Sequence, residues 1–255
     1  MKLEEFSQDD FERASKRLVR SLTRGKTSSS QPKAILLGGQ SGAGKTTIHR
    51  VKQREFQGNI IIIDGDSYRS FHRNYLGLQE KYGKDSVDYT KVFAGQMVEY
   101  LVDELSKQGY HLLIEGTLRT TEVPRKTSQL LTTKGYQVSL AVIATKPELS
   151  YLSTLIRYEE LHAIDPSQAR ATPKEHHDGI VEHLVDNLRE LENDKIFNQV
   201  QIYRRDQSCV YDSQVDETSA AVVLHECLFG KWNKVEKEML KLGQERLREL
   251  GGIDK

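Results

Sequence analysis

AILLGGQSGAGKTTI, residues 34–48, places a short apolar strand directly before a complete G-x-x-x-x-G-K-[ST] phosphate-binding loop. Glycines let successive backbone N–H groups turn inward around phosphate oxygens, and a helix expected to begin near Lys45 adds the partial positive charge of its N-terminus. Lys45 is expected to contact the β- and γ-phosphates, and the Thr46 hydroxyl to be a ligand of Mg²⁺. The segment therefore predicts that the chain binds a nucleoside triphosphate. The predicted nucleotide-binding residues are Gly39, Gln40, Ser41, Gly42, Ala43, Gly44, Lys45, Thr46 and Thr47.

The composition of the 255 residues is that of a globular protein with one large α/β domain and additional helices. Because the formal net charge is zero, electrostatics gives no reason to expect nucleic acid or an anionic membrane as the main partner. Cys209 and Cys227 lack metal-ligand spacing and are interpreted as reduced thiols. The acidic N-terminus does not resemble a signal peptide, and no run of about 18 apolar residues predicts a membrane span. We therefore expect a cytoplasmic protein.

Apolar runs alternate with helical patterns along the chain. Four runs read as strands buried on both faces, and a fifth short run is a possible return strand. They are residues 59–63, 111–115, 138–144, 200–203 and, for the return strand, 209–211. Together with the strand at residues 34–37, this order predicts a mainly parallel sheet of five to six strands with helices on both faces.

Helical patterns fill the segments between these strands, and all of them are assigned to a single domain, residues 1–255. Capping boxes beginning at Thr145 and Thr172 mark the expected starts of two helices. The N-terminal helix either packs on the core or serves a partner. The expected helices are residues 3–24, 46–55, 89–107, 145–162, 172–192 and 231–250.

Acidic side chains follow the apolar strands at the edge where open parallel sheets bind their ligands. Asp64 and Asp66 come directly after the second strand, and Glu115 ends the third. A phosphoryl-transfer enzyme needs one carboxylate to activate the attacking hydroxyl, and usually another to hold the water shell of the metal. Asp66 suits the first role, and Asp64 or Glu115 the second. The alternative is that these residues form only a polar exit from the strand.

Two arginines, Arg157 and Arg170, flank the loop between two predicted helices. Guanidinium groups stabilise the dispersed negative charge of a phosphoryl-transfer transition state, so residues 157–170 are predicted to form an arginine-bearing lid. From spacing alone, solvated surface arginines explain the same pattern. Glu99 lies opposite the apolar stripe of the 89–107 helix and would ordinarily be a solvated glutamate.

Four features in this order resemble the zeta toxin family over nearly the whole chain. They are the phosphate loop, the IIIIDGDSYR segment at residues 60–69, the LLIEGTLR segment at residues 112–119, and the paired arginines. The resemblance implies a P-loop kinase-like fold. It also implies a toxin that uses ATP and Mg²⁺ to phosphorylate the 3′-hydroxyl of the amino sugar in UDP-N-acetylglucosamine, which blocks synthesis of the cell-wall precursor.

The resemblance also implies roles for particular residues. Asp66 would be the catalytic base, with Lys45, Arg157 and Arg170 as the other catalytic residues. The helical region 68–105 would supply much of the substrate cleft, and a small helical antitoxin would block the ATP site. The implied substrate-binding residues are Asp66, Glu99, Glu115, Thr117 and Arg119.

Two other functions are open from the residues. The same kinase fold could phosphorylate another small molecule, such as an antibiotic or a nucleotide. A non-kinase NTPase switch is the second alternative, although residues 233–236 read N-K-V-E and lack the N-K-x-D element of guanine specificity.

Overall fold

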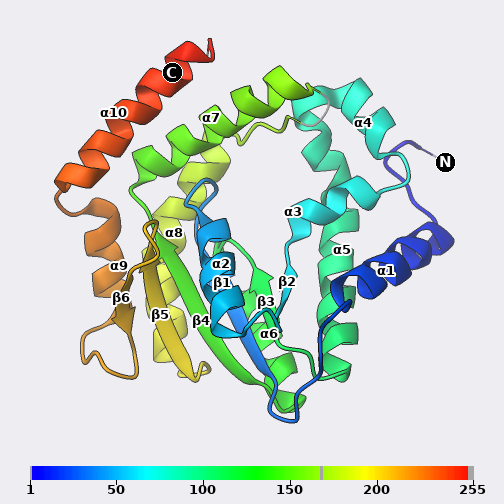
Figure 1. Ribbon diagram of the computed structural model, residues 1–255, viewed down its shortest axis with the longest axis horizontal. Coiled ribbons are helices and arrows are strands. Elements are labelled where there is room, and N and C mark those ends of the chain that lie inside the picture. The colour runs from blue at the N-terminus through cyan, green and yellow to red at the C-terminus, as the bar shows by residue number, and fades with distance from the viewer. Residues whose placement is uncertain (1, 167–168, 252–255) are drawn as a thin grey trace.

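Six strands form one sheet in the order β2-β3-β1-β4-β5-β6 (Figure 1). The computed structural model describes residues 2–166 and 169–251. All neighbouring pairs are parallel except β5 and β6, which are antiparallel. This confirms the predicted mainly parallel sheet, including the return strand. The strands are β1 Lys33–Gly38, β2 Ile61–Ile63, β3 Leu112–Glu115, β4 Gln137–Ala144, β5 Gln199–Arg204 and β6 Cys209–Asp212.

The central strand β1 is apolar throughout because both of its faces are covered. Ala34 and Leu36 belong to one hydrophobic cluster, whereas Ile35 and Leu37 belong to the cluster on the other face. Successive side chains of a strand point to opposite faces, so an uninterrupted apolar run is what a doubly covered strand requires. Because β1 is also an internal strand of the sheet, the phosphate loop that follows it lies near the centre of the sheet edge.

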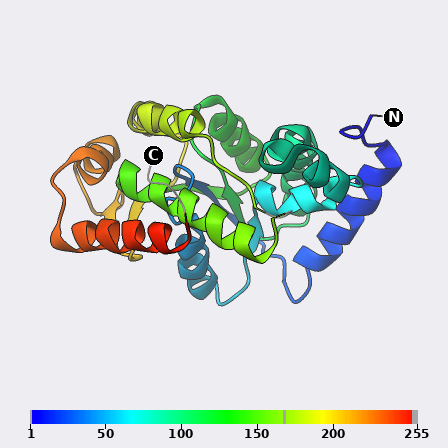
Figure 2. The same cartoon turned by 90° about the horizontal axis from the view of Figure 1, so that it is seen from above.

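Helices cover the two faces unequally, as Figure 2 shows from above. On one face α2 packs through the buried Ile48, while α5, α6, α8 and α9 contribute buried side chains to the cluster on the other face. Two short 3₁₀ turns, Arg69–Phe71 and Gly83–Asp85, connect the helices that precede α5. The helices are α1 Gln8–Leu22, α2 Lys45–Glu55, α3 Gly65–Tyr68, α4 Tyr75–Tyr82, α5 Ser86–Lys107, α6 Glu122–Thr133, α7 Pro147–Ile164, α8 Lys174–Asn193, α9 Ala220–Phe229 and α10 Lys234–Glu249.

The N-terminal helix α1 packs on α5. It begins after Ser7, whose side chain and that of Asp10 form a reciprocal capping box, so it is shorter than the predicted 3–24. The Phe6 ring lies 5.1 Å from the ring of Phe93 on α5. Of the two expectations for this helix, packing on the core is therefore observed.

The capping boxes predicted at Thr145 and Thr172 are wrong. Neither α7 nor α8 has a side-chain cap, and their N-cap residues are Lys146 and Pro173. The Thr145 hydroxyl instead donates a 2.7 Å hydrogen bond to the backbone oxygen of Ala43 in the phosphate loop. A tertiary acceptor thus replaced the local one that the sequence pattern suggested.

The helix α7 crosses above the carboxyl ends of the strands, and α10 packs along it (Figure 1). Arg246 of α10 forms a 3.0 Å ion pair with Glu160 of α7. Asn233 and Glu236 form a capping box, so α10 begins three residues after the predicted position 231. Within residues 2–166 and 169–251, no helix combines the length and apolarity needed to cross a membrane.

Candidate functional site

The phosphate loop joins β1 to α2 and is closed by its own lysine. Lys45 Nζ donates hydrogen bonds to the backbone oxygens of Gly39, at 2.9 Å, and Gln40, at 3.2 Å. Gly44, with a φ of +100°, is the N-cap of α2, so the backbone N–H groups of the first turn of that helix face the loop. A cation and a helix N-terminus therefore converge at the end of β1, as the sequence predicts for a phosphate site.

The start of α7 packs against this loop and determines its shape. A Cβ at Gly42 would overlap the backbone oxygen of Ser150 and lie 2.8 Å from Thr154 Cγ2, and the φ of Gly42 is +74°. The side chain of Gln40 is fully buried, and its Nε2 donates a 2.7 Å hydrogen bond to the backbone oxygen of Thr145. The loop is thus held from behind by the β4–α7 connection.

A buried polar chain extends from the loop to α8. Gln40 Nε2 donates to Ser150 Oγ at 3.2 Å, and Ser150 Oγ lies 2.8 Å from His177 Nε2. His177 Nδ1 is in turn 3.0 Å from Asp178 Oδ1. Ser150 is completely buried, so this Ser-His-Asp arrangement supports the loop and offers no nucleophile to a substrate.

Glu115 stands at the end of β3 beside the first turns of α2. Its carboxylate lies 3.7 Å from Lys45 Nζ and 2.8 Å from His49 Nε2. The contact with His49 is close but misaligned, because the buried Nε2 makes no hydrogen bond of acceptable geometry. Sequence reasoning missed His49. Its position four residues after Lys45, on the same face of the helix, is the signal that could have identified it.

The two aspartates after β2 have different environments. Asp64 is the N-cap of α3, where its carboxylate accepts from Asp66 N at 3.0 Å and from Ser67 Oγ at 2.7 Å. The side chain of Asp66 is 68% exposed and accepts a 2.8 Å hydrogen bond from Arg69 Nε. Arg69 also donates to the backbone oxygen of Val87 at the start of α5. Asp64 therefore stabilises the turn from which the side chain of Asp66 extends into solvent.

Arg170 contacts the Asp66 segment directly. It donates to the backbone oxygen of Asp66 at 3.0 Å and to the Tyr75 hydroxyl at 2.8 Å. Neighbouring protein atoms disfavour the Asp66 carboxylate, but the Arg69 hydrogen bond and the charges of Arg69, Arg170 and Arg157 outweigh this effect and lower the pKa of Asp66. Arg157 and Arg170 therefore both act on this carboxylate, which distance along the chain does not reveal.

The predicted lid, residues 157–170, spans two kinds of structure. Arg157 lies within α7, which continues to Ile164, whereas Arg170 lies on the connection to α8. Residues 167 and 168 of this segment lie outside the described part of the chain. The helical region predicted at 68–105 consists of α4, the two 3₁₀ turns and most of α5.

A left-handed residue shapes the loop after β3. Leu118 has a φ of +55°, its side chain packs over Gly38, and its backbone oxygen accepts a 2.8 Å hydrogen bond from Asn187 of α8. Thr117 and Arg119 flank this residue, and the Thr117 hydroxyl accepts a 3.4 Å hydrogen bond from Arg119 N. Both predicted substrate-binding residues are thus held at the carboxyl end of β3.

Three other predicted residues differ in their freedom to bind a ligand. The Thr47 hydroxyl donates to the backbone oxygen of Gly44 at 2.8 Å. Thr46 is exposed at the start of α2. Glu99 is exposed on α5, one residue after Val98, whose Cγ2 would lie 3.1 Å from a Cβ at Gly65 in α3.

Arg205 is a second residue that sequence reasoning missed. It lies in the turn between β5 and β6, donates a 2.7 Å hydrogen bond to Ser153 Oγ of α7, and would lie 3.2 Å from a Cβ at Gly44. Burial lowers the pKa of its guanidinium group. Asp66, Thr117 and Arg119 thus lie on the β2–β3 side of the phosphate loop, and Arg205 lies on the β5 side. The position of Arg205 just after the parallel strand β5 is the signal in the sequence that could have identified this residue.

Comparison with known proteins places this site in a family. Residues 18–216, which include all the predicted site residues, match the family described as Zeta toxin. The chain belongs to the zeta toxin family. The prediction from the sequence is confirmed.

Curated zeta toxins resemble the chain over most of its length. Toxin PezT of Streptococcus pneumoniae serotype 4 is 69% identical over 250 residues, which cover 98% of this chain and 99% of that protein. Toxin zeta of Streptococcus pyogenes is 40% identical, over 82% of this chain and 72% of the relative.

Solved structures agree with the family assignment. A structure from the characterisation of the PezAT toxin–antitoxin system of S. pneumoniae matches with a TM-score of 0.93 and 67% identity, over 98% of this chain and all of the other. The AvrRxo1-ORF1:-ORF2 complex with ATP matches with a TM-score of 0.60 at 13% identity, over 96% of this chain and 83% of the other, which shows a shared fold. This chain is therefore a zeta-family toxin with a P-loop kinase-like fold.

Proposed function

We propose that this toxin transfers the γ-phosphoryl group of ATP to the 3′-hydroxyl of the amino sugar of UDP-N-acetylglucosamine and thereby blocks synthesis of the cell-wall precursor. The single observation that carries the kinase reaction is the position of Asp66, whose carboxylate pairs with Arg69 and whose backbone oxygen accepts from Arg170, at the same sheet edge as the phosphate loop. Family membership supports the choice of acceptor.

The position of the proposed catalytic base relative to the phosphate loop determines the direction in which ATP must lie. The γ-phosphate has to point toward Asp66, on the β2–β3 side of the loop, so the adenosine has to extend toward β4 and β5. Arg205 stands on that side, beside Gly44. We assign Arg205 to the adenosine end of the nucleotide, where a guanidinium group can stack on the base.

The chemical step needs one proton acceptor and several cations. Asp66 takes the proton of the sugar hydroxyl as its oxygen forms a bond to the γ-phosphorus, and the bond from that phosphorus to the bridging oxygen breaks, releasing ADP. Lys45 neutralises charge at the β- and γ-phosphates. Arg157 and Arg170, which already act on Asp66, stabilise the transferring group.

The loop residues fit a magnesium ion. Mg²⁺ in such sites is bound by one or two protein oxygens plus phosphates and water, and the described residues hold no cluster of three or more His, Cys, Asp or Glu side chains. The exposed Thr46 hydroxyl would be its direct ligand. Glu115, beside Lys45, suits the surrounding water shell better than Asp64, whose oxygens already cap α3. When bound, the ion would neutralise charge on the phosphates.

Mass spectrometry of UDP-N-acetylglucosamine incubated with Mg²⁺-ATP and the purified protein tests the proposal. We expect one added phosphate, a loss of about 10²–10⁴-fold in rate in Asp66→Asn with ATP affinity retained, and a loss of ATP binding in Lys45→Ala. An unchanged sugar nucleotide would refute the acceptor. ADP release with an antibiotic or nucleotide would then identify another kinase, and hydrolysis without any acceptor would identify an NTPase switch.

The partner and location follow from the same proposal. A small helical antitoxin, PezA-like by family, would neutralise the toxin by covering the ATP site. Both substrates are cytoplasmic metabolites, and the free thiols of Cys209 and Cys227 are compatible with a reducing compartment. Competition between the co-expressed antitoxin and a fluorescent ATP analogue would test this arrangement, and simultaneous binding would contradict it.

A further inference from the structure

The outer face of α1 carries a row of arginines that the proposed reaction does not use. Arg13, Arg17 and Arg20 recur at intervals of four and three residues, which places them within about 60° of arc on one face of the helix. Arg24 follows four residues later, in the turn after α1. We call these four residues the arginine row. All four are exposed, while Phe11 and Leu18 on the opposite face are buried.

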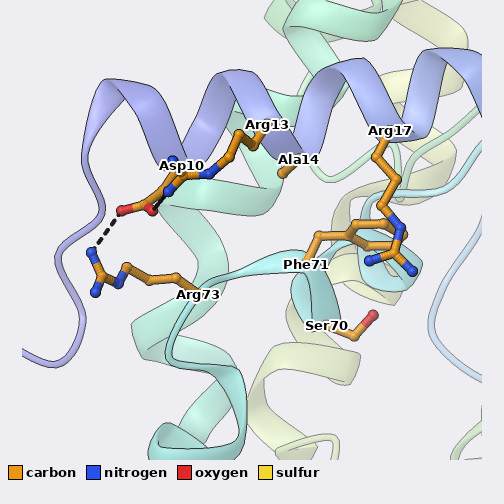
Figure 3. Close-up of a pocket in the computed structure, with 7 residues that line it drawn as sticks. All are labelled: Asp10, Arg13, Ala14, Arg17, Ser70, Phe71 and Arg73. Atoms are coloured by element: carbon orange, nitrogen blue, oxygen red, sulfur yellow. Dashed lines mark hydrogen bonds and ion pairs between the residues drawn. The ribbon is translucent and has the colours of Figure 1, made fainter.

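A groove of about 460 Å³ runs beside the arginine row, between α1 and the segment that follows α3 (Figure 3). Arg13 and Arg17 line one wall, and Phe71 and Arg73 line the other. The Arg17 guanidinium carbon lies 5.6 Å from the centroid of the Phe71 ring. Ala14 forms part of the α1 wall, so apolar surface separates the positive charges of the groove.

The charge of this region is not balanced by the residues that surround it. Among the residues that the structure describes, Asp10 is the one carboxylate that lines the groove. Its side chain is 8% exposed, and it pairs with both Arg13 and Arg73. Arg17 and Arg20 form no ion pair with any residue that the structure describes. Guanidinium groups left without counter-charges on a protein of zero formal net charge favour an acidic partner.

We propose that the arginine row and its groove form a docking surface for an acidic, amphipathic helix of a protein partner. The row extends over twelve residues, 13–24, and its eleven helical rises span about 16 Å, which is the length of three turns of a helix packed alongside α1. Carboxylates at intervals of four and three residues would meet the guanidinium groups, and an apolar side chain would contact Phe71.

The same surface is less suited to nucleic acid or an anionic membrane. The exposed carboxylates of Asp9 and Glu12 flank the N-terminal end of the row and would repel a continuous line of phosphates. A helical partner can instead place uncharged residues opposite Asp9 and Glu12. The interruption of the charges by Phe71 and Ala14 also matches a partner with an apolar stripe.

Fluorescence anisotropy with two labelled 16-residue peptides tests the proposal on the full chain. Both are alanine-rich and contain one leucine and four glutamates. One places the glutamates at positions 1, 5, 8 and 12, and the other distributes them around the helix. We expect the wild-type protein to bind the first at least about tenfold more tightly than the second, and Arg17→Glu/Arg20→Glu to remove this preference.

The matched control is Lys237→Glu/Lys241→Glu on α10, which changes the net charge equally at exposed positions on another helix. It should retain the affinity of the wild type within about twofold. Circular dichroism verifies that both variants fold. If Arg17→Glu/Arg20→Glu does not fold, Arg17→Gln/Arg20→Gln takes its place. Equal binding of the two peptides, equal loss in both variants, or tighter binding to a 12-base-pair duplex or to phosphatidylserine vesicles would overturn the proposal.

Discussion

Replacement of Gly42 by alanine should destabilise the whole protein through a contact with α7. The new Cβ would overlap the backbone oxygen of Ser150 and approach Thr154 Cγ2 to 2.8 Å. Since Ser150 lies in the first turn of α7 and bonds to Gln40 and His177, relief of the overlap must move that turn or the loop.

Two costs add at this position. A left-handed φ of +74° costs an alanine about 1 kcal/mol relative to glycine. Overpacking of a closely packed site costs about 1–3 kcal/mol more. We therefore expect Gly42→Ala to lose about 2–4 kcal/mol of unfolding free energy.

Gly135 supplies the matched control. Its φ is +81°, and a Cβ there would meet nothing within 4 Å, so Gly135→Ala should lose only the conformational term, about 1 kcal/mol. Urea titrations of the wild type and the two variants, followed by far-UV circular dichroism, measure both losses. Equal losses in the two variants would refute the argument that contact with α7 determines the shape of the loop.

Three further substitutions test the site. The hydrogen bond and the charge of Arg69 lower the pKa of Asp66, so Arg69→Gln should raise that pKa and move the acid limb of the pH–rate profile to higher pH; an unmoved limb would exclude Asp66 as the titrating base. Arg205→Gln should weaken ATP binding about 5–30-fold by calorimetry, as loss of a contact worth about 1–2 kcal/mol predicts, with the acceptor KM unchanged; a selective change in the acceptor KM would contradict its assignment. Asn187→Ala removes the hydrogen bond to Leu118 and should raise the acceptor KM with little effect on ATP, and unaltered kinetics would show that the loop holds its shape without this bond.

Local sequence patterns predicted most of the fold because they report burial. The α5 stripe of Phe93, Met97, Leu101 and Leu105 is buried at every position, as its period of four requires. The apolar run of β1 correctly indicated a strand covered on both faces. Capping was the exception, because a threonine hydroxyl binds whichever acceptor is nearest, and for Thr145 that acceptor is Ala43 on a distant segment.

Within the site, the sequence revealed residues that belong to recognisable local motifs. Lys45, Asp66, Glu115 and Arg119 all follow strands or a glycine-rich loop, where the rule for parallel sheets directs attention. His49 and Arg205 belong to no motif. Their positions, four residues after Lys45 and directly after β5, are weak signals, and the structure distinguishes them by placing them beside Glu115 and Gly44. The spacing of Arg157 and Arg170 likewise left a solvated role open, whereas in the structure Arg170 donates to the backbone oxygen of Asp66 and both charges lower the pKa of the Asp66 carboxyl group.

By itself, the sequence of this protein determined the parallel sheet, the phosphate loop and the family, because each depends on contiguous residues with a characteristic period or spacing. Only the tertiary structure decided which aspartate is exposed and which caps a helix, and which of the predicted site residues lie on each side of the phosphate loop. Those features depend on strand order and on contacts between residues far apart in the chain, such as Arg170 with Asp66 and Arg205 with Ser153. Burial periodicity carries no information about such contacts.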